Sequence, residues 1–414
     1  MPDIKEALRD FNPWWKGSFK TTFKEREMHK QIQKYLALPH IIAFTGLRRV
    51  GKTTLMLKIV EDAINDGFDA KNIIYFSFDE FKSVEIRQVI NEYEDLMERD
   101  FKNGKYKLLL DEIQKLDNWE NQIKRIYDTF KNVKIIVSGS ESLFINKKLK
   151  ETLAGRMFDF KIDTLSFREF LLFKGINFKP VGLYEKELSK LLEEYILTLG
   201  FPELVNINDR EIIKKYIRES IVEKVIFSDM QNLFRIKDIS LIESLLNIFL
   251  EEPGQLIDVA DLSNNLGVSR QTLSNYLTYL EESFLIKKLY NYSKSRRKVE
   301  RKLKKYYPAI VSANLLFKDD ELSKSKVFEW LMVMQLKAEF FWRDPYKNEV
   351  DVVMVEKKPL PIEIKYGKAD TEGILAFMKK FNVSKGIVLT KNREEKRMIN
   401  GKYILFIPAF KFLL

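Results

Sequence analysis

A short segment near the N-terminus has the residue types and spacing needed to bind a chain of phosphates. It reads GLRRVGKTT and comprises Gly46, Leu47, Arg48, Arg49, Val50, Gly51, Lys52, Thr53 and Thr54. Glycines let backbone N–H groups close around phosphate oxygens, a lysine adds positive charge at the outer phosphates, and a threonine hydroxyl can ligate Mg²⁺. The segment therefore predicts an ATP site, with Lys52 also acting in catalysis. Spacing alone assigns no phosphate contact to either arginine.

An acidic pair, Asp111 and Glu112, ends the apolar run KLLLDE. Carboxylates at the end of a buried strand are costly unless they face a cation or water. Beside a phosphate-binding loop, we expect Thr53 to ligate Mg²⁺ and Asp111 to hold it through water. We expect Glu112 to polarise the water that attacks the γ-phosphate. The alternative is a strand that ends in solvated acids.

A third apolar run, KIIVS, ends at Ser138 and is followed by GSES. A small polar side chain at this strand end would sense the γ-phosphate or orient the attacking water. We assign that role to Ser140, with Ser138 as the alternative. The same residues also fit an ordinary turn followed by a helix N-cap.

A second set of chemical groups lies near the C-terminus, in the stretch NEVDVVMVEKKPLPIEIK. Two strands joined by a turn centred near Lys357 would pair Asp351 with Glu363, and alternation would put Lys365 on the same face. Two acids that hold Mg²⁺ and a lysine that orients or deprotonates water are what metal-assisted phosphodiester cleavage requires. The alternative is a solvated strand face with a salt bridge.

The elements that position these groups follow from hydrophobic periodicity. Residues 40–45 predict a strand that leads into the phosphate loop, and the residues after Lys52 predict a helix. From 165 to about 250, apolar residues recur at helical spacing, which indicates several short helices. We interpret this region as a lid that moves when nucleotide binds.

Residues 255–282 predict a helix-turn-helix. A short helix ends at Gly267, and Ser269 caps a second helix that runs to about Glu282. The second helix would bury leucines and expose the polar residues at its start, Arg270, Gln271 and Asn275. Strands at 284–290 and 296–307 would complete a winged helix. Such domains contact either DNA or protein.

The positive charge is concentrated in one segment, 285–305, which has ten Lys or Arg residues and one acid. The rest of the chain has 61 bases against 59 acids, a net charge of +2. Charge placed this way favours a polyanion partner. We therefore predict that this basic segment, the wing of the winged helix, contacts DNA through Lys294, Arg296, Arg297 and Lys298.

Composition excludes several other classes of function. The chain has 414 residues and no cysteine, so thiol catalysis, Cys-ligated zinc and disulfide scaffolds are excluded. Its two histidines, His29 and His40, are too few for a His-rich metal site and are expected on the surface or in loops. No apolar run reaches the roughly 18 residues of a membrane span, so we expect a cytoplasmic protein without a membrane partner.

These motifs resemble those of AAA-type ATPases of the additional-strand P-loop class. The whole chain resembles a bacterial and archaeal family that joins such an ATPase to a C-terminal domain of unknown function related to restriction endonucleases. The segments that support this resemblance are GLRRVGKTTL, LLLDEIQK, VSGSES, LAGR before DTLSFREFL, GFPE, KKYYPAIVSA and PIEIKYG.

The resemblance implies two further site residues. Arg156 would be an arginine finger that reaches a neighbouring subunit's nucleotide in a homo-oligomer. The alternative is an arginine that pairs locally at a helix end. Glu329 matches the additional acid that nuclease-like folds often carry before the D-(x)n-E-x-K core.

The expected fold is α/β, in four parts: a P-loop ATPase domain with a parallel sheet (1–164), the helical lid (165–250), the winged helix (251–305) and an α/β restriction-endonuclease-like domain (306–414). The leading functional hypothesis is an ATP-hydrolysing, Mg²⁺-dependent enzyme that acts on or with DNA. The alternative is a regulatory ATPase whose nuclease-like domain only binds DNA or a partner protein.

Overall fold

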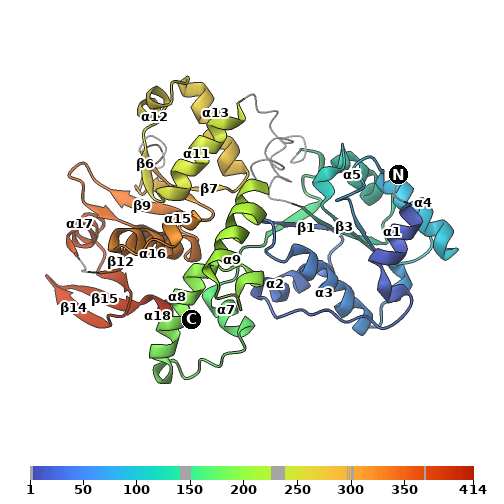
Figure 1. Cartoon of the computed structure of the whole chain (residues 1–414), viewed down its shortest axis with the longest axis horizontal. Coiled ribbons are helices and arrows are strands. Elements are labelled where there is room, and N and C mark those ends of the chain that lie inside the picture. The colour runs from blue at the N-terminus through green and yellow to red at the C-terminus, as the bar shows by residue number, and fades with distance from the viewer. Residues whose placement is uncertain are drawn as a thin grey trace. The chain divides into compact units, whose positions relative to one another are not determined.

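The computed structural model of the chain divides into two compact units, Met1–Thr164 and Leu165–Leu414 (Figure 1). It describes residues 3–139, 151–224, 238–295, 297, 299, 303–367 and 370–414. Among these residues, no helix combines the length and the apolar character needed to cross a lipid bilayer.

The first unit is built on a parallel five-stranded sheet with the order β2-β3-β4-β1-β5. Strand β4 lies between β1 and β3, and it is the additional strand that the resemblance implies. The strands are β1 (Ile41–Thr45), β2 (Ile73–Ser77), β3 (Tyr106–Asp111), β4 (Val133–Ser138) and β5 (Met157–Lys161). The predicted α/β fold with an N-terminal parallel sheet is confirmed.

Helices cover both faces of this sheet because the central strands are apolar on both sides. On one face, Ile41, Ala43, Leu108 and Leu110 pack with apolar residues of α1, α4 and α5. Helix α3 lies on the opposite face (Figure 1). The helices are α1 (Ile4–Phe11), α2 (Glu27–Leu36), α3 (Lys52–Asn65), α4 (Ile86–Met97) and α5 (Trp119–Thr129).

The second unit begins with the helices that the sequence assigns to a lid. They are α7 (Phe167–Phe173), α8 (Glu185–Thr198), α9 (Arg210–Lys215), a π-helix (Tyr216–Val222) and α11 (Ile239–Glu251). Helix α8 packs against the C-terminal helices α16 (Glu321–Gln335) and α18 (Ala409–Phe412). A salt bridge of 2.6 Å between Glu185 and Lys411 adds to this contact. The predicted lid is therefore part of the same compact unit as the C-terminal domain.

The next elements match the predicted helix-turn-helix. Helix α12 (Val259–Asn265) precedes Gly267, and α13 (Arg270–Glu282) begins after Ser269, whose hydroxyl accepts a hydrogen bond from the Thr272 N–H at 3.0 Å. Leu273, Leu277 and Leu280 are buried, as predicted. Three strands follow or flank these helices: β6 (Gln255–Ile257), β7 (Ile286–Asn291) and β8 (Lys304–Pro308).

Strands β6, β7 and β8 belong to a larger sheet of order β10-β9-β7-β8-β6. Its other strands, β9 (Phe340–Arg343) and β10 (Glu349–Val350), come from the C-terminal part of the chain. Strand β7 pairs with β9 through its second edge, Tyr290 opposite Phe340. Strand β8 therefore crosses the boundary predicted after Lys305, and its sheet takes strands from both sides of that boundary.

The remaining sheet has the order β11-β12-β13-β15-β14. Its strands are β11 (Val352–Val355), β12 (Pro359–Lys365), β13 (Lys385–Thr390), β14 (Glu395–Ile399) and β15 (Lys402–Pro408), and α17 (Glu372–Phe381) packs against it. The antiparallel pair β11 and β12 places Val352 opposite Ile362. This is the register predicted from a turn centred near Lys357, so that prediction is confirmed.

Two local predictions are wrong. Arg297 and Val299 have helical backbone rather than lying in a strand from 296, because the Val299 N–H donates to the Ser295 carbonyl at 3.1 Å, one helical turn back. His29 is buried in α2 rather than exposed, since its Nε2 pairs with the Asp62 carboxylate of α3 at 2.7 Å.

Candidate functional site

The phosphate loop connects β1 to α3, and its glycines are required by geometry. A Cβ on Gly46 would lie 2.2 Å from the Ile162 carbonyl oxygen, so only glycine fits there. Gly51 has φ of +96° and is the N-cap of α3. A helix N-terminus favours anions, so the loop has the geometry expected of a phosphate-binding element.

The Lys52 side chain folds back over this loop. Its Nζ donates to the carbonyl oxygens of Gly46 and Leu47, each at 2.9 Å, and the side chain is buried. Both acceptors are neutral carbonyls, and phosphate oxygens are stronger partners for an ammonium group. The lysine is thus held at the loop, within reach of the phosphates that the loop would bind.

Asp111 is the centre of the polar contacts at the end of β3. Its Oδ2 accepts from the Thr53 hydroxyl at 2.7 Å and from the Tyr75 hydroxyl at 2.8 Å. Its Oδ1 accepts from the Ser138 hydroxyl and from the Glu112 N–H, the latter at 3.0 Å. The carboxylate is therefore held in one orientation beside the hydroxyl with which it is expected to share Mg²⁺. Oxygen donors of this kind fit that cation.

Glu112 lies next to Asp111 with a left-handed backbone, at φ of 52°. Its carboxylate accepts a 2.6 Å hydrogen bond from the Gln114 amide. Burial raises the pKa of this carboxyl, the Lys52 charge opposes that shift, and the Asp111 charge adds to it. A carboxylate with a raised pKa is a better proton acceptor, which suits a group that polarises water.

Two residues that contact this site have no signal in the motifs. Arg26 is buried and donates to the carbonyl oxygens of Val50, at 3.0 Å, and Asp163, at 2.9 Å. It therefore supports the phosphate loop from outside. Burial and the Asp111 charge raise the pKa of Tyr75, which keeps its hydroxyl protonated as a donor. Both residues lie far along the chain from the groups they contact, so spacing could not reveal them.

The remaining candidates of the first unit have different outcomes. Ser140 lies outside the described residues, whereas the alternative, Ser138, is buried and bonded to Asp111. Arg156 is partly exposed and pairs with Asp128 of its own chain, with 3.4 Å between Nε and Oδ1. The local pairing that the sequence left open therefore occurs. An action on a neighbouring subunit stays a prediction.

The C-terminal candidates converge on a second cluster. Asp351 and Glu363 are both buried at 7% exposure, so the alternative of a solvated strand face is wrong. Asp351 Oδ2 accepts from the Ile364 N–H at 2.8 Å, and Glu363 Oε1 pairs with Lys365 at 2.8 Å. Glu363 Oε2 is buried and has no hydrogen-bond partner. Burial raises the pKa of both carboxyls, and their mutual charge adds to the shift of Asp351.

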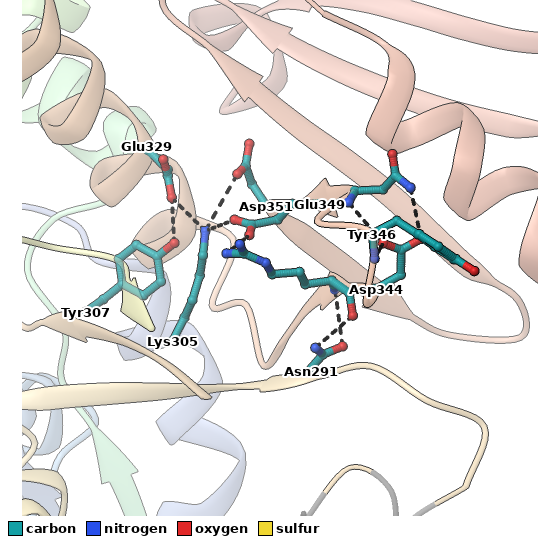
Figure 2. Close-up of polar contacts among 10 residues, drawn as sticks. Asn291, Lys305, Tyr307, Glu329, Asp344, Tyr346, Glu349 and Asp351 are labelled. Carbon is teal, nitrogen blue, oxygen red and sulfur yellow. Dashed lines mark hydrogen bonds and ion pairs between the residues drawn. The ribbon is translucent and has the colours of Figure 1, made fainter. Parts of the chain in front are cut away.

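Three residues outside the predicted core complete this cluster, as Figure 2 shows. Lys305 of β8 points its ammonium group at Glu329 of α16, Glu349 of β10 and Asp351. The Tyr307 hydroxyl donates to Glu329 at 2.7 Å. Glu329 therefore lies at the predicted site, and Lys305, Tyr307 and Glu349 were missed. We call the group Lys305, Tyr307, Glu329, Glu349, Asp351, Glu363 and Lys365 the C-terminal acidic cluster.

The cluster has the chemistry of a metal site without its arrangement. Its four carboxylates are hard oxygen donors of the type that Mg²⁺ or Mn²⁺ prefers, and one buried oxygen of Glu363 lacks a partner. Even so, no three acidic or histidine side chains within the described ranges are grouped closely enough to hold a metal ion. The Lys305 ammonium lies between the carboxylates instead (Figure 2).

The candidate DNA-contacting residues lie in two places. Arg270, Gln271 and Asn275 are exposed at the start of α13, where Gln271 donates to Asn275 at 2.9 Å. Lys294 and Arg297 are exposed in the basic segment, whereas Arg296 and Lys298 lie outside the described residues.

Comparison with known proteins identifies the class of the first unit. Residues 39–171 match the model of the AAA domain family. Together with the parallel sheet and the phosphate loop, this match defines an AAA-type P-loop ATPase domain. Residues 189–311 and 325–410 match two further models, each described as a domain of unknown function, DUF8612 and DUF4143.

The chain is 30% identical over 327 residues to an uncharacterized protein of Methanocaldococcus jannaschii, MJ1544, across 77% of this chain and 71% of that protein. It belongs to the family of that protein. A second uncharacterized protein of the same organism, MJ1637, is 27% identical over 429 residues, across 94% of this chain and 88% of its own length.

Among solved structures, Cdc6p of Pyrobaculum aerophilum aligns with 76% of this chain and 97% of its own, at 12% identity. Its TM-score of 0.32 is too low to support a conclusion.

Proposed function

We propose that the chain is a Mg²⁺-dependent ATPase whose hydrolysis cycle acts on a DNA-binding, nuclease-like second unit. One observation carries the ATPase part: the Thr53 hydroxyl and the Asp111 carboxylate meet at 2.7 Å beside the phosphate loop, and Glu112 follows directly. Those are the groups that Mg²⁺-assisted transfer of a γ-phosphoryl group to water requires.

Each residue has a distinct task in this proposal. The loop from Gly46 to Thr54 binds the phosphates through its N–H groups, and Lys52 exchanges its carbonyl partners for phosphate oxygens. Thr53 and Asp111 would hold Mg²⁺, which neutralises charge on the transferring phosphoryl group when bound. Glu112 orients the attacking water and accepts its proton.

The direct test is phosphate release by the purified chain with saturating Mg²⁺-ATP, beside a Glu112→Gln variant. The proposal expects turnover in the wild type and nucleotide binding with little turnover in the variant. A chain that binds ATP and releases no phosphate, with or without DNA, would contradict hydrolysis.

The DNA part of the proposal is a winged-helix contact. It is supported by the order α11, β6, α12, α13, β7, β8, by the exposed polar residues at the start of α13, and by the net charge of +9 on residues 285–305. The test is binding of labelled duplex DNA by the whole chain, with salt titration.

Nuclease action is proposed for the C-terminal acidic cluster, where Asp351 and Glu363 would hold Mg²⁺, Glu329 would be the additional acid and Lys365 would orient water. One observation favours the alternative of a regulatory ATPase whose second unit only binds. The ammonium group of one lysine, Lys305, already forms ion pairs with three of the carboxylates. Metal-dependent nicking of DNA that disappears in Asp351→Ala would support cleavage, and its absence under all metals would favour the regulatory role.

A further inference from the structure

Lys305 is a buried lysine in a segment whose high positive charge predicts exposure. Lys305 belongs to the basic stretch 285–305, yet only 5% of its surface is exposed. Lysine is rarely buried to this extent unless its charge is paired. Its position in β8 explains the burial, because β8 pairs with β7 on one edge and with β6 on the other.

The pairing of this lysine is with the C-terminal acidic cluster. Its Nζ lies 2.5 Å from Glu349 Oε1, 3.4 Å from Glu329 Oε1 and 3.9 Å from Asp351 Oδ1 (Figure 2). These three carboxylates come from β10, from α16 and from the residue before β11. One ammonium group therefore joins three separate elements, which is the task that a bound cation performs in a metal site.

The surrounding contacts fix the lysine in this position. Glu329 also accepts from Tyr307, which lies two residues along β8 and so on the same face as Lys305. Glu349 also pairs with Arg343 at 3.1 Å, on its other oxygen. These contacts hold the carboxylates of Glu329 and Glu349 toward Lys305. The same strand supplies both the lysine and the tyrosine.

We infer that the Lys305 ammonium is the resident counter-ion of the C-terminal acidic cluster, and that it and a divalent cation exclude one another. The two compete for the same oxygens of Glu329, Glu349 and Asp351. This agrees with the absence, in the ranges that the structure covers, of any three acids grouped for a metal. The cluster would admit a cation only when Lys305 leaves it or loses its charge.

This inference rests on the proposed nuclease-like role for its relevance to function, but its test measures cation binding and not cleavage. The variants are Lys305→Met and Lys305→Gln, which remove the charge, and Lys305→Arg, which keeps it. The use of two neutral variants guards against one of them failing to fold. Lys358→Met is the matched control, because Lys358 is an exposed lysine in the turn between β11 and β12.

The measurement is Mn²⁺ binding to the nucleotide-free whole chain, by calorimetry and by the shift of the thermal unfolding midpoint. We expect at least about tenfold tighter Mn²⁺ binding in the neutral variants, because a positive charge within a few ångströms of the ligands is removed. Their unfolding midpoints should lie below that of the wild type without metal and should rise with Mn²⁺. Lys305→Arg and Lys358→Met should behave as the wild type.

A further substitution assigns the bound ion to this cluster rather than to Asp111. Adding Asp351→Asn to Lys305→Gln should abolish the gain in Mn²⁺ affinity. Equal Mn²⁺ affinity in the wild type and both neutral variants, including no binding by any of them, would overturn the inference. Tighter Mn²⁺ binding by the neutral variants, without nuclease activity, would support the inference and reject cleavage. Failure of the inference and failure of the proposed nuclease role are therefore distinguishable.

Discussion

The hydroxyl of Thr53 donates a 2.7 Å hydrogen bond to the carboxylate of Asp111, although 58 residues separate them in the chain. Thr53 is in the first turn of α3 and Asp111 is the last residue of β3. The contact joins the phosphate loop to the acidic end of β3. It fits the expectation that Thr53 ligates Mg²⁺ and that Asp111 holds the ion through water.

The first prediction concerns the division of labour between Lys52 and Glu112. Lys52→Ala should weaken ATP binding, because it removes the positive charge at the outer phosphates. Glu112→Gln should keep ATP affinity and lower kcat about 100-fold or more, since only the water-polarising group is lost. Nucleotide binding by fluorescence and phosphate release at saturating Mg²⁺-ATP measure the two effects. Wild-type turnover by Glu112→Gln would remove this residue from the mechanism.

The second prediction concerns Tyr75, whose hydroxyl orients Asp111. Tyr75→Phe should lower the free energy of unfolding by about 1–2 kcal/mol, because a buried hydrogen bond to a carboxylate is lost. It should also lower kcat several-fold with little change in ATP affinity. Tyr106→Phe is the matched control, since Tyr106 is on the adjacent strand β3 and its hydroxyl bonds to the Asp100 carbonyl. Equal effects of both variants on kcat would make the role of Tyr75 purely structural.

The third prediction separates the two readings of Arg156. If it acts on a neighbouring subunit, Arg156→Ala should bind ATP normally and hydrolyse it at least about tenfold more slowly. Wild-type specific activity should then rise with protein concentration. Asp128→Asn breaks the local ion pair and keeps the arginine, so it should stay active. Specific activity that is independent of concentration in a strict monomer would reject the role in trans.

The fourth prediction is that the basic segment grips DNA electrostatically. Replacing Lys294, Arg296, Arg297 and Lys298 by alanine should flatten the slope of log affinity against log salt by a few units at most, since each phosphate contact contributes about 0.9. Fluorescence anisotropy with duplex DNA measures the slope. Arg270→Ala or Asn275→Ala should instead alter any preference among sequences. ATPase activity without DNA should persist, and an unchanged slope would favour a protein partner for this segment.

The fifth prediction is a gain in stability when Glu363 loses its charge. Burial raises the pKa of this carboxyl, Glu329 adds to the shift, and Lys365 and Lys305 oppose it. A raised pKa in the folded state means that stability falls as pH rises from the ordinary glutamate value to the raised value. Without metal, Glu363→Gln should therefore be more stable than the wild type at pH 8, by about 1 kcal/mol, and less so at pH 5. Urea unfolding at both pH values tests this, and a variant less stable at pH 8 would contradict it.

Much of the architecture could be predicted because its signals are local. The phosphate loop, the acidic strand end and the capped helix after Ser269 each depend on residues close together in the chain. The pairing of Val352 with Ile362 could also be predicted, because a short turn fixes the register of an antiparallel pair. These features follow from the chemistry and spacing of adjacent residues.

Other features depended on long-range packing. The sequence alone determined the phosphate loop, the residue types expected to hold Mg²⁺ beside it, and a basic segment. Only the tertiary structure decided that Arg26 supports the loop and that Tyr75 and Ser138 orient Asp111. It also decided that Lys305 leaves the charged surface, because pairing of β8 with both β6 and β7 turns one residue of a basic run toward carboxylates that are partly or fully buried. The charge pattern of the sequence shows where basic residues gather along the chain. Strand pairing in the folded protein determines which of these residues turns inward to face carboxylates.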